Sequence, residues 1–309
     1  MNEELSPEDL FRLNVLLAQE IKAIRLDEGN LALHALLAGG EEASMPLHPT
    51  CRPDKYLRLV REVLSGHALG SPGGYPVYLS RWTRHGQMES TNLGQLLLIG
   101  EPEAVVAVVH SPALTDEIAG YAWWAMPTIE HARLMLAREA VAHGRMGPIL
   151  ADFLIEHLPF LQEDHLAIMD TVAVLLYSGT LSEAQRQTVW KRGKRQNSYY
   201  VAFLEYCPDQ LPDPSAFAFI DACLEILARP DTQEVVSRTL DAIGRHFASL
   251  PVPDDEHRAV CQARLAHVDA SLTHPIFARS TAIGSLMRRK IEPLIAPVTA
   301  DLARLRDAQ

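Results

Sequence analysis

Residues 66–88 hold the most unusual group of chemically capable side chains in this 309-residue chain. The segment is rich in glycine, and aromatic and basic residues are interleaved along it. Guanidinium groups pair with anions and stack on flat rings, so such a group suits a peptide, an anion or a nucleotide base. The alternative is an ordered connection whose rings pack on neighbouring helices. The predicted partner-binding residues are Tyr75, Tyr78, Arg81, Trp82, Arg84 and His85.

A second basic cluster lies between residues 186 and 195, a stretch without any acidic residue. Lysine and arginine side chains bind phosphate groups, so the cluster is a candidate anion or RNA contact. The alternative is structural, because basic residues near the end of a helix also offset the helix dipole. The candidate residues are Arg186, Lys191, Arg192, Lys194 and Arg195.

Motifs for catalysis or metal binding are weak elsewhere in the chain. His48 and Cys51 have a spacing that metals use, but one such pair does not make a zinc site. The chain has no phosphate-binding loop, no HExxH motif and no GxSxG motif. We therefore predict a protein that is not an enzyme and has no cofactor or metal. Asp170 and Asp221 interrupt apolar helices, and we expect each to make a structural bond to another helix.

Apolar residues recur at helical spacing through most of the chain, with proline, glycine or serine between the segments. Ser6 and Pro7 predict the start of one long helix that continues to Ile24. A second helix is predicted around residues 54–65, and residues 66–88 then lack helical periodicity. The later helices are expected near residues 90–100, 102–110, 112–126, 128–143, 147–157, 163–178, 182–193, 197–207, 215–229, 231–249, 254–273 and 276–308.

This succession predicts an all-α fold. Short helices gain their stability by packing apolar faces together, and short loops favour antiparallel neighbours. Consecutive antiparallel hairpins build either a HEAT-like or armadillo-like solenoid or a large irregular bundle, and the pattern fits both. We expect N-terminal helices and the glycine-rich loop in residues 1–88, followed by a body of helical hairpins in residues 89–309. The two parts can also be one continuous domain.

The net charge of −11 is uneven along the chain. Residues 89–185 carry three basic and thirteen acidic side chains, which supplies −10 of the total. An acidic surface of this kind opposes nucleic-acid binding over the middle of the chain. The four cysteines are widely spaced, no apolar run is long enough to cross a membrane, and the N-terminus is acidic. We therefore expect a cytoplasmic protein that does not enter a membrane.

Three segments, residues 5–17, 48–57 and 121–127, resemble the DsrS family. These are accessory proteins encoded with the dissimilatory sulfite reductase genes of sulfur-oxidising bacteria. The resemblance implies a cytoplasmic accessory role in sulfur oxidation, and it brings no catalytic residues with it.

The predicted function is a non-enzymatic helical scaffold or adaptor that binds a partner protein. One alternative is an RNA-contacting regulator that uses the basic segment at residues 186–195. Another is an enzyme or small-ligand binder with a pocket under the loop at residues 66–88, although no small molecule is indicated by a motif.

Overall fold

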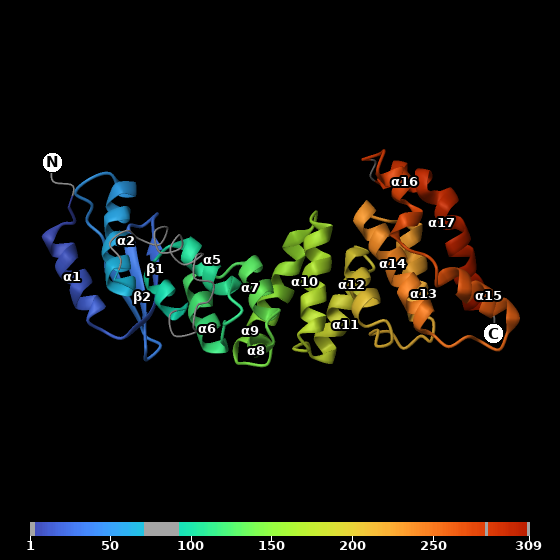
Figure 1. Cartoon of the computed structure of the whole chain (residues 1–309), viewed down its shortest axis with the longest axis horizontal. Coiled ribbons are helices and arrows are strands. Elements are labelled where there is room, and N and C mark those ends of the chain that lie inside the picture. Colours follow the sequence, from blue (N-terminus) through green and yellow to red (C-terminus); the bar gives the residue numbers. More distant parts are fainter. Residues whose placement is uncertain (1–3, 71–92, 282–283, 308–309) are drawn as a thin grey trace. The chain divides into compact units, whose positions relative to one another are not determined.

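A computed structural model describes residues 4–70, 93–281 and 284–307 of the chain (Figure 1). The chain forms two compact units, an N-terminal unit of residues 1–153 and a C-terminal unit of residues 154–309. The domain boundary predicted at residues 88 and 89 lies outside the described residues. Among those residues, no helix is both long enough and apolar enough to cross a bilayer.

The N-terminal unit begins with a helix, α1 (Pro7–Leu17), that is shorter than predicted. Ser6 caps it as expected, because its hydroxyl oxygen accepts a hydrogen bond from the Asp9 amide at 3.1 Å. The predicted continuation to Ile24 is wrong, since the chain enters a strand, β1 (Ile21–Asp27). Ala23 and Ile24 are adjacent and both buried, on opposite faces of that strand. Burial on both faces removes the polar and apolar alternation that identifies a strand.

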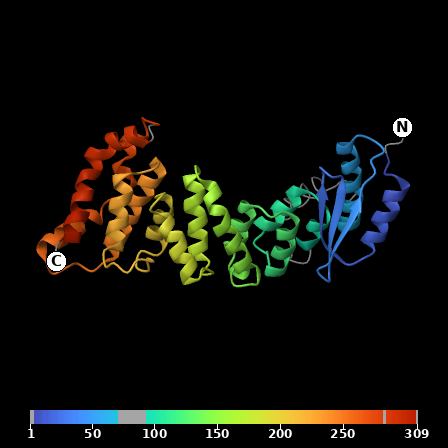
Figure 2. The ribbon, with the colours of Figure 1, turned by 180° about the vertical axis from the view of Figure 1, so that it is seen from behind.

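Two further strands follow, β2 (Ala32–Leu37) and β3 (Glu42–Pro46). They complete an antiparallel sheet with the order β1-β2-β3 (Figures 1 and 2). Gly40 turns the chain between β2 and β3 with a φ of 84°, a conformation that glycine adopts without strain. The all-α prediction is therefore wrong for this part of the chain, although the molecule is mostly helical.

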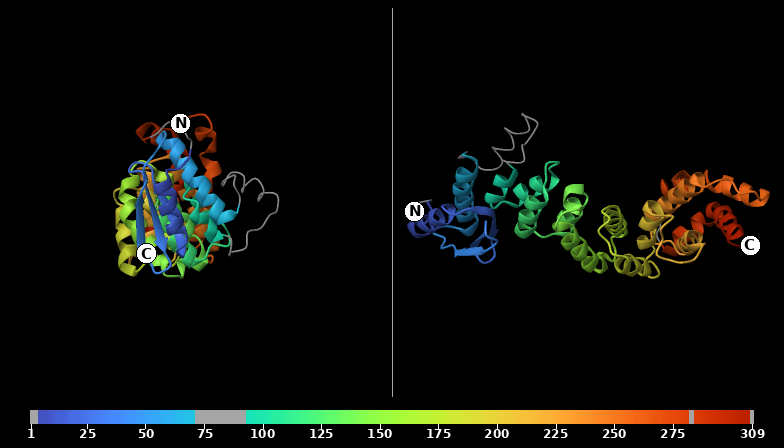
Figure 3. Two further views of the ribbon diagram at one scale, coloured as in Figure 1. Left: turned by 90° about the vertical axis from the view of Figure 1, so that its left-hand side faces the viewer. Right: turned by 90° about the horizontal axis from the view of Figure 1, so that it is seen from below.

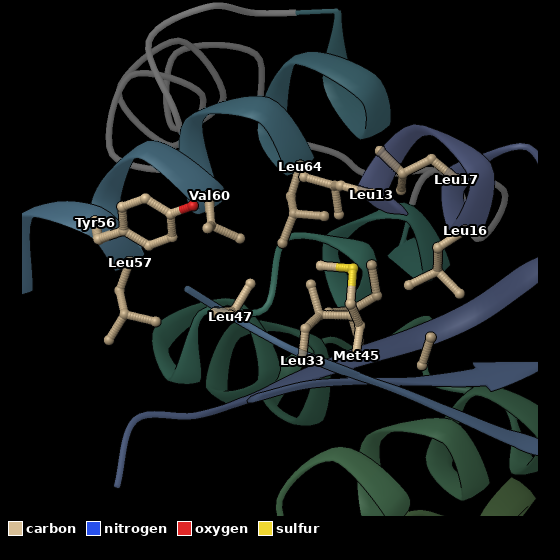
Figure 4. Packing of buried hydrophobic residues seen from close by; sticks show 12 residues of the cluster. Leu13, Leu16, Leu17, Leu33, Met45, Leu47, Tyr56, Leu57, Val60 and Leu64 are labelled. Carbon is tan, nitrogen blue, oxygen red and sulfur yellow. The ribbon is translucent and has the colours of Figure 1, made fainter. Parts of the chain in front are cut away.

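The core of the N-terminal unit lies between the sheet and two helices, α1 and α2 (Pro53–Leu69). Both helices lie on the same side of the sheet (Figure 3). Figure 4 shows leucines of α1 and α2 meeting Leu33 of β2 and Met45 of β3. Burying each such side chain contributes roughly 1.5 to 3 kcal/mol. This packing is what holds α1 against the sheet.

Helix α2 continues to Leu69 and ends at Gly70, whose φ of 60° is left-handed. Residues 66–69 are therefore helical, and the prediction of an unhelical segment from residue 66 is wrong for them. Residues 71–88 lie outside the described residues.

The rest of the N-terminal unit is helical. The helix predicted at residues 128–143 is divided in two, because Arg138 leaves the helical conformation with a φ of −92° and a ψ of 123°. The helix predicted from residue 112 begins four residues later, with Thr115 as its cap. The elements are η1 (Gly94–Leu98), α5 (Pro102–His110), α6 (Asp116–Ala125), α7 (Ile129–Leu136), α8 (Glu139–Ala142) and the shared α9 (Met146–His157).

The C-terminal unit is helical, and its helices up to residue 249 lie close to the predicted ranges. The helix predicted at residues 254–273 ends at Leu265, and the one predicted at residues 276–308 begins at Gly284, after a separate short helix at His274–Phe277. Helix α12 packs against both α10 and α14, and α15 packs against α14 and α17. Its elements are η2 (Leu158–Leu161), α10 (His165–Tyr177), α11 (Glu183–Arg192), α12 (Ser198–Tyr206), α13 (Ala218–Ala228), α14 (Gln233–Ser249), α15 (Glu256–Leu265), η3 (Ala270–Leu272), α16 (His274–Phe277) and α17 (Gly284–Asp307).

The two carboxylates that interrupt apolar helices make the predicted structural bonds. Asp170 on α10 lies 2.9 Å from the guanidinium of Arg238 on α14. Asp221 on α13 lies 2.8 Å from the guanidinium of Arg306 on α17. Each ion pair joins two helices of the C-terminal unit, so these acids have a structural explanation.

Candidate partner-binding groove between α15 and α17

The six residues predicted to bind a partner, Tyr75, Tyr78, Arg81, Trp82, Arg84 and His85, lie outside the described residues. The basic segment at residues 186–195 is described, and the structure divides it. Arg186 donates to the Gln210 carbonyl at 2.7 Å, and Arg192 donates to the Ile155 carbonyl at 3.0 Å. These two arginines hold neighbouring segments of the C-terminal unit together.

The other three basic side chains of that segment, Lys191, Lys194 and Arg195, are exposed. They lie at the end of α11 and in the turn that follows it. The described residues show no ion pair to any of them. The basic surface that an anion can contact therefore consists of three side chains, fewer than the five predicted from the sequence.

A groove of about 730 Å³ lies in the C-terminal unit between α15 and the end of α17. Asp255 caps α15, because its carboxylate accepts a hydrogen bond from the Arg258 amide at 2.8 Å. Residues of α15 form one wall and the last turns of α17 form the other. The side chains that line the groove include Arg258, Val260, Cys261, Arg264, Arg304 and Leu305.

A buried carboxylate fixes the two walls relative to each other. Asp301 on α17 has only 4% of its surface exposed. Arg264 on α15 binds it through two atoms, with Nε at 2.7 Å from Oδ2 and Nη2 at 2.6 Å from Oδ1. Arg304 adds a bond from Nη1 to Oδ1 at 3.1 Å. Hydrogen bonding to Asp301 raises the pKa of Arg264, so this guanidinium stays charged.

The groove combines an apolar contact surface with hydrogen-bond donors. Val260 is 48% exposed beside the nearly buried Leu305 and Cys261. The Arg264 and Arg304 side chains are 54% and 66% exposed, and a guanidinium has five N–H groups. Their remaining N–H groups are available to a carboxylate of a bound segment. Acidic Asp255, Glu256 and Asp307 also line the groove and would bind basic groups of the same segment.

Sequence reasoning missed this groove, although one signal was present. Val298, Leu302 and Leu305 follow helical spacing along the buried face of α17. Asp301 occupies a position on that same face, three residues after Val298 and four before Leu305. A carboxylate on an apolar face predicts a paired charge, but the arginine that it binds comes from another helix.

A serine, a histidine and an aspartate meet at the start of α10 and α12 without forming a catalytic triad. Ser198 Oγ lies 2.7 Å from His165 Nδ1, and Asp231 Oδ2 lies 3.8 Å from the same nitrogen. A triad uses the two ring nitrogens for different partners and needs an accessible hydroxyl. Ser198 is fully buried. The cluster therefore ties helix ends together.

His48 was predicted not to form a metal site with Cys51 alone. In the structure, His48 has a structural role in the N-terminal unit. Its amide and its Nδ1 contact the Asp9 carboxylate at 2.7 Å and 2.9 Å, and the Tyr56 hydroxyl donates to Asp9 at 2.6 Å. Cys51 does not join this cluster and contacts the Arg52 carbonyl. Across the described parts of the chain, no three histidine, cysteine or acidic side chains are grouped to hold a metal ion.

Comparison with protein-family models, with curated proteins and with solved structures gave no match at the level of significance applied. The resemblance to the DsrS family therefore stays a prediction from the sequence. The groove is accordingly interpreted from its own residues.

Proposed function

We propose that this protein is a non-enzymatic helical scaffold or adaptor, and that the groove between α15 and α17 binds a segment of a partner protein. The observation that carries the proposal is the exposed apolar side chain of Val260 in the same groove as two guanidinium groups that Asp301 holds in place. Apolar centres with a charged rim are typical of protein interfaces. The bound segment would place apolar side chains on Val260 and carboxylates near Arg264 and Arg304.

The groove is suited to binding because its donors are fixed before a partner arrives. Arg264 and Arg304 are held by the same carboxylate, so they lose less conformational freedom on binding than free side chains. Packing of α15 against α17 also fixes the apolar surface. Antiparallel helical hairpins, arranged as a solenoid of the HEAT or armadillo kind, would present such a groove as part of a longer binding surface.

The test compares three forms of the tagged full-length protein in cells of its native source. They are the wild type, Val260→Asp in the groove and Val252→Asp as the matched control. Val252 is 78% exposed and does not line the groove. Proteins retained by each form are identified by mass spectrometry. Each candidate is then purified and titrated against the three forms by calorimetry.

We expect the wild type and Val252→Asp to bind one defined protein equally. Val260→Asp should bind it at least about tenfold more weakly, because a carboxylate would replace the apolar contact and repel the acids of the bound segment. Equal binding by all three forms would exclude this groove. A wild type that retains RNA or no macromolecule would contradict the adaptor function itself.

The RNA-contacting alternative has a more limited site than the sequence suggested. With Lys191, Lys194 and Arg195 as the remaining contacts, the slope of log affinity against log salt should be about −2 for single-stranded RNA. Replacing all three with glutamine should abolish binding, and Arg138→Gln would serve as the control. Binding that is independent of salt concentration would exclude this alternative.

We propose that the adaptor acts in the cytoplasm, in the accessory role in sulfur oxidation that the DsrS-like segments imply. An enzyme or small-ligand site under the loop at residues 66–88 stays an alternative prediction. A screen for metabolites that raise the melting temperature tests it, and Arg81→Glu should abolish any such rise.

A further inference from the structure

The outer edge of β3 presents backbone groups that point away from the sheet. Leu47 N donates to Leu31 O, and Leu37 N donates to Glu41 O. Because hydrogen-bonding direction alternates along a strand, residues 43 and 45 also face β2, while Glu42, Ser44 and Pro46 face outward. In the described part of the chain, no other segment bonds to these outward groups.

The two edges of the sheet differ. At the other edge of the sheet, β1 packs against η1 and α6 of the same unit. At the β3 edge, a groove of about 470 Å³ lies between the strand and α1. Phe11 and Val15 of α1 line it and are 68% and 50% exposed. An unpaired strand edge beside exposed apolar side chains is suited to the addition of another strand.

The outward groups of β3 are complementary to a second copy of the same strand. In an antiparallel pair centred on Ser44, each Ser44 N–H meets the Ser44 carbonyl of the other copy. Each Glu42 N–H then meets a Pro46 carbonyl. Pro46 has no N–H, so every outward N–H of both strands finds an acceptor in this register. Only the Glu42 carbonyls remain with water.

Charge also favours the antiparallel register. Glu41 and Glu42 lie at one end of β3, and Pro46, Leu47 and His48 lie at the other. Antiparallel pairing places the acidic end of one strand beside the neutral or basic end of the other. A parallel arrangement would instead align Glu42 with Glu42, and like charges directly opposite each other are destabilising. The apolar groove beside each strand would be covered by the same residues of the other copy.

We infer that two copies of this chain associate through β3, with the strands antiparallel about Ser44 and with Phe11 and Val15 buried at the interface. The surface differs from the α15–α17 groove, so this inference does not depend on the proposed function. Two-fold symmetric dimers are the commonest protein oligomers, and such an interface needs the same patch on both copies.

The experiment measures the dimer dissociation constant of the full-length protein by sedimentation velocity. Ser44→Pro removes an outward N–H without removing a bond to β2, and Ser44→Thr is its control. Val15→Asp introduces charge into the groove, and its control is Ile149→Asp, because Ile149 is equally exposed at 50% and does not line the groove. The α15–α17 groove is unchanged in all four variants.

Ser44→Pro and Val15→Asp should each weaken the dimer at least about tenfold, because each removes a contact made twice across the two-fold axis. The two controls should dimerise as the wild type does. Circular dichroism and melting curves identify any variant that fails to fold. If Ser44→Pro fails to fold, the dissociation constant of Val15→Asp alone tests the proposed interface.

A cysteine variant tests the register itself. Opposite residues of a hydrogen-bonded antiparallel pair have Cα atoms about 5.5 Å apart, within the range that a disulfide spans. Ser44→Cys should therefore give a disulfide-linked dimer under mild oxidation, beyond what the wild-type cysteines give. A monomeric wild type at about 100 μM would overturn the inference, since stable interfaces of standard size bind in the micromolar range or tighter. A dimer that both test variants leave intact would overturn it as well.

Discussion

At the scale of single residues, the described structure is held by carboxylates that the surrounding protein keeps charged. Asp9 is the clearest case, with 1% of its surface exposed. Burial by itself would raise the pKa of this carboxyl. Hydrogen bonds from the Tyr56 hydroxyl and from the amide and ring of His48 together outweigh burial and hold the pKa below its ordinary value of 3.8. The ionised form therefore fastens α1 to α2 and to the end of β3.

We predict that Asp9→Asn destabilises the N-terminal unit by about 2 to 3 kcal/mol at pH 7, because the charged acceptor of three hydrogen bonds is lost. In the wild type, the folded pKa is lower than the unfolded one. The contribution of Asp9 is therefore complete above pH 3.8 and disappears as the pH falls through the folded pKa. Urea denaturation from pH 7 to pH 3 measures both effects.

The control for this prediction is Asp54→Asn, since the Asp54 side chain is 76% exposed on the same unit. It should change stability by less than about 1 kcal/mol, as expected for an exposed charge. If the difference between the wild type and Asp9→Asn stays constant down to pH 3, the ionised carboxylate is not the source of the stabilisation.

At the scale of elements, Arg238 connects three helices of the C-terminal unit. It lies on α14 and donates to Glu205 of α12, at 3.0 Å from Nε to Oε2, and to Asp170 of α10 at 2.9 Å. The Glu205 side chain is only 10% exposed. Removal of the arginine would leave this acid with the more distant Arg245 at 3.5 Å.

Arg238→Met should therefore cost about 2 to 4 kcal/mol, because a mostly buried charge loses its main partner. The double variant Arg238→Met with Glu205→Met should recover most of that loss, since apolar side chains of similar volume replace the pair. Arg229→Met is the control, with a side chain 68% exposed and a pair distance of 3.5 Å. Chemical denaturation of the wild type, the single variants Arg238→Met and Glu205→Met and the double variant tests this cycle, and additive losses would contradict it.

A glycine on α14 shows how closely the elements approach each other. A Cβ atom added at Gly244 would lie 2.0 Å from the Val268 carbonyl oxygen, which belongs to the backbone between α15 and η3. Gly244→Ala should cost about 1 to 3 kcal/mol, because the backbone must move.

The matched substitution is Gly66→Ala on α2. A Cβ atom there meets nothing within 4 Å, so this change should stabilise the protein by about 0.5 to 1 kcal/mol through helix propensity. Melting temperatures would measure the two substitutions. A higher melting temperature for Gly244→Ala would show that packing there is looser than the structure indicates, and a lower one for Gly66→Ala would contradict the helix-propensity argument.

Most helices of the C-terminal unit could be predicted from the sequence, while the end of α15, the start of α17 and the sheet could not. Proline and serine at helix starts and apolar residues at three and four positions are local signals, and they placed α10 to α14 within a few residues. The strands were missed although β1 and β2 are neighbours in the sequence, because both faces of β1 are buried at Ala23 and Ile24 and the alternation typical of a strand is lost. Leu10 and Ile21 also fit a helical spacing by chance, although Leu10 proves to be 39% exposed.

The candidate groove was missed because its residues come from two helices that are distant in the sequence. Each of its residues is ordinary in its own helix, and only the contact between α15 and α17 brings Arg264 to Asp301. Of the side chains that the sequence did single out as sites, six lie outside the described residues. Arg186 and Arg192 are bonded to backbone carbonyls, while Lys191, Lys194 and Arg195 are exposed. The sequence of a basic segment does not show which of its side chains form hydrogen bonds with other parts of the protein.

At the scale of the whole molecule, each of the two compact units has a buried core of its own. Stability should therefore be local to each unit. Asp9→Asn removes bonds within residues 1–153, and Gly244→Ala disturbs packing within residues 154–309. Hydrogen–deuterium exchange of the full-length protein should show faster exchange in α2 for the first variant and in α14 for the second.

The prediction separates local from global unfolding because amide exchange reports the free energy of the smallest opening that exposes each amide. If the units unfold independently, Asp9→Asn should leave exchange in α14 unchanged, and Gly244→Ala should leave α2 unchanged. If the chain unfolds in one cooperative step, both variants should accelerate exchange of the slowest amides in both helices. The second outcome would mean that the two cores unfold together. Either substitution would then lower the free energy of unfolding of the entire chain.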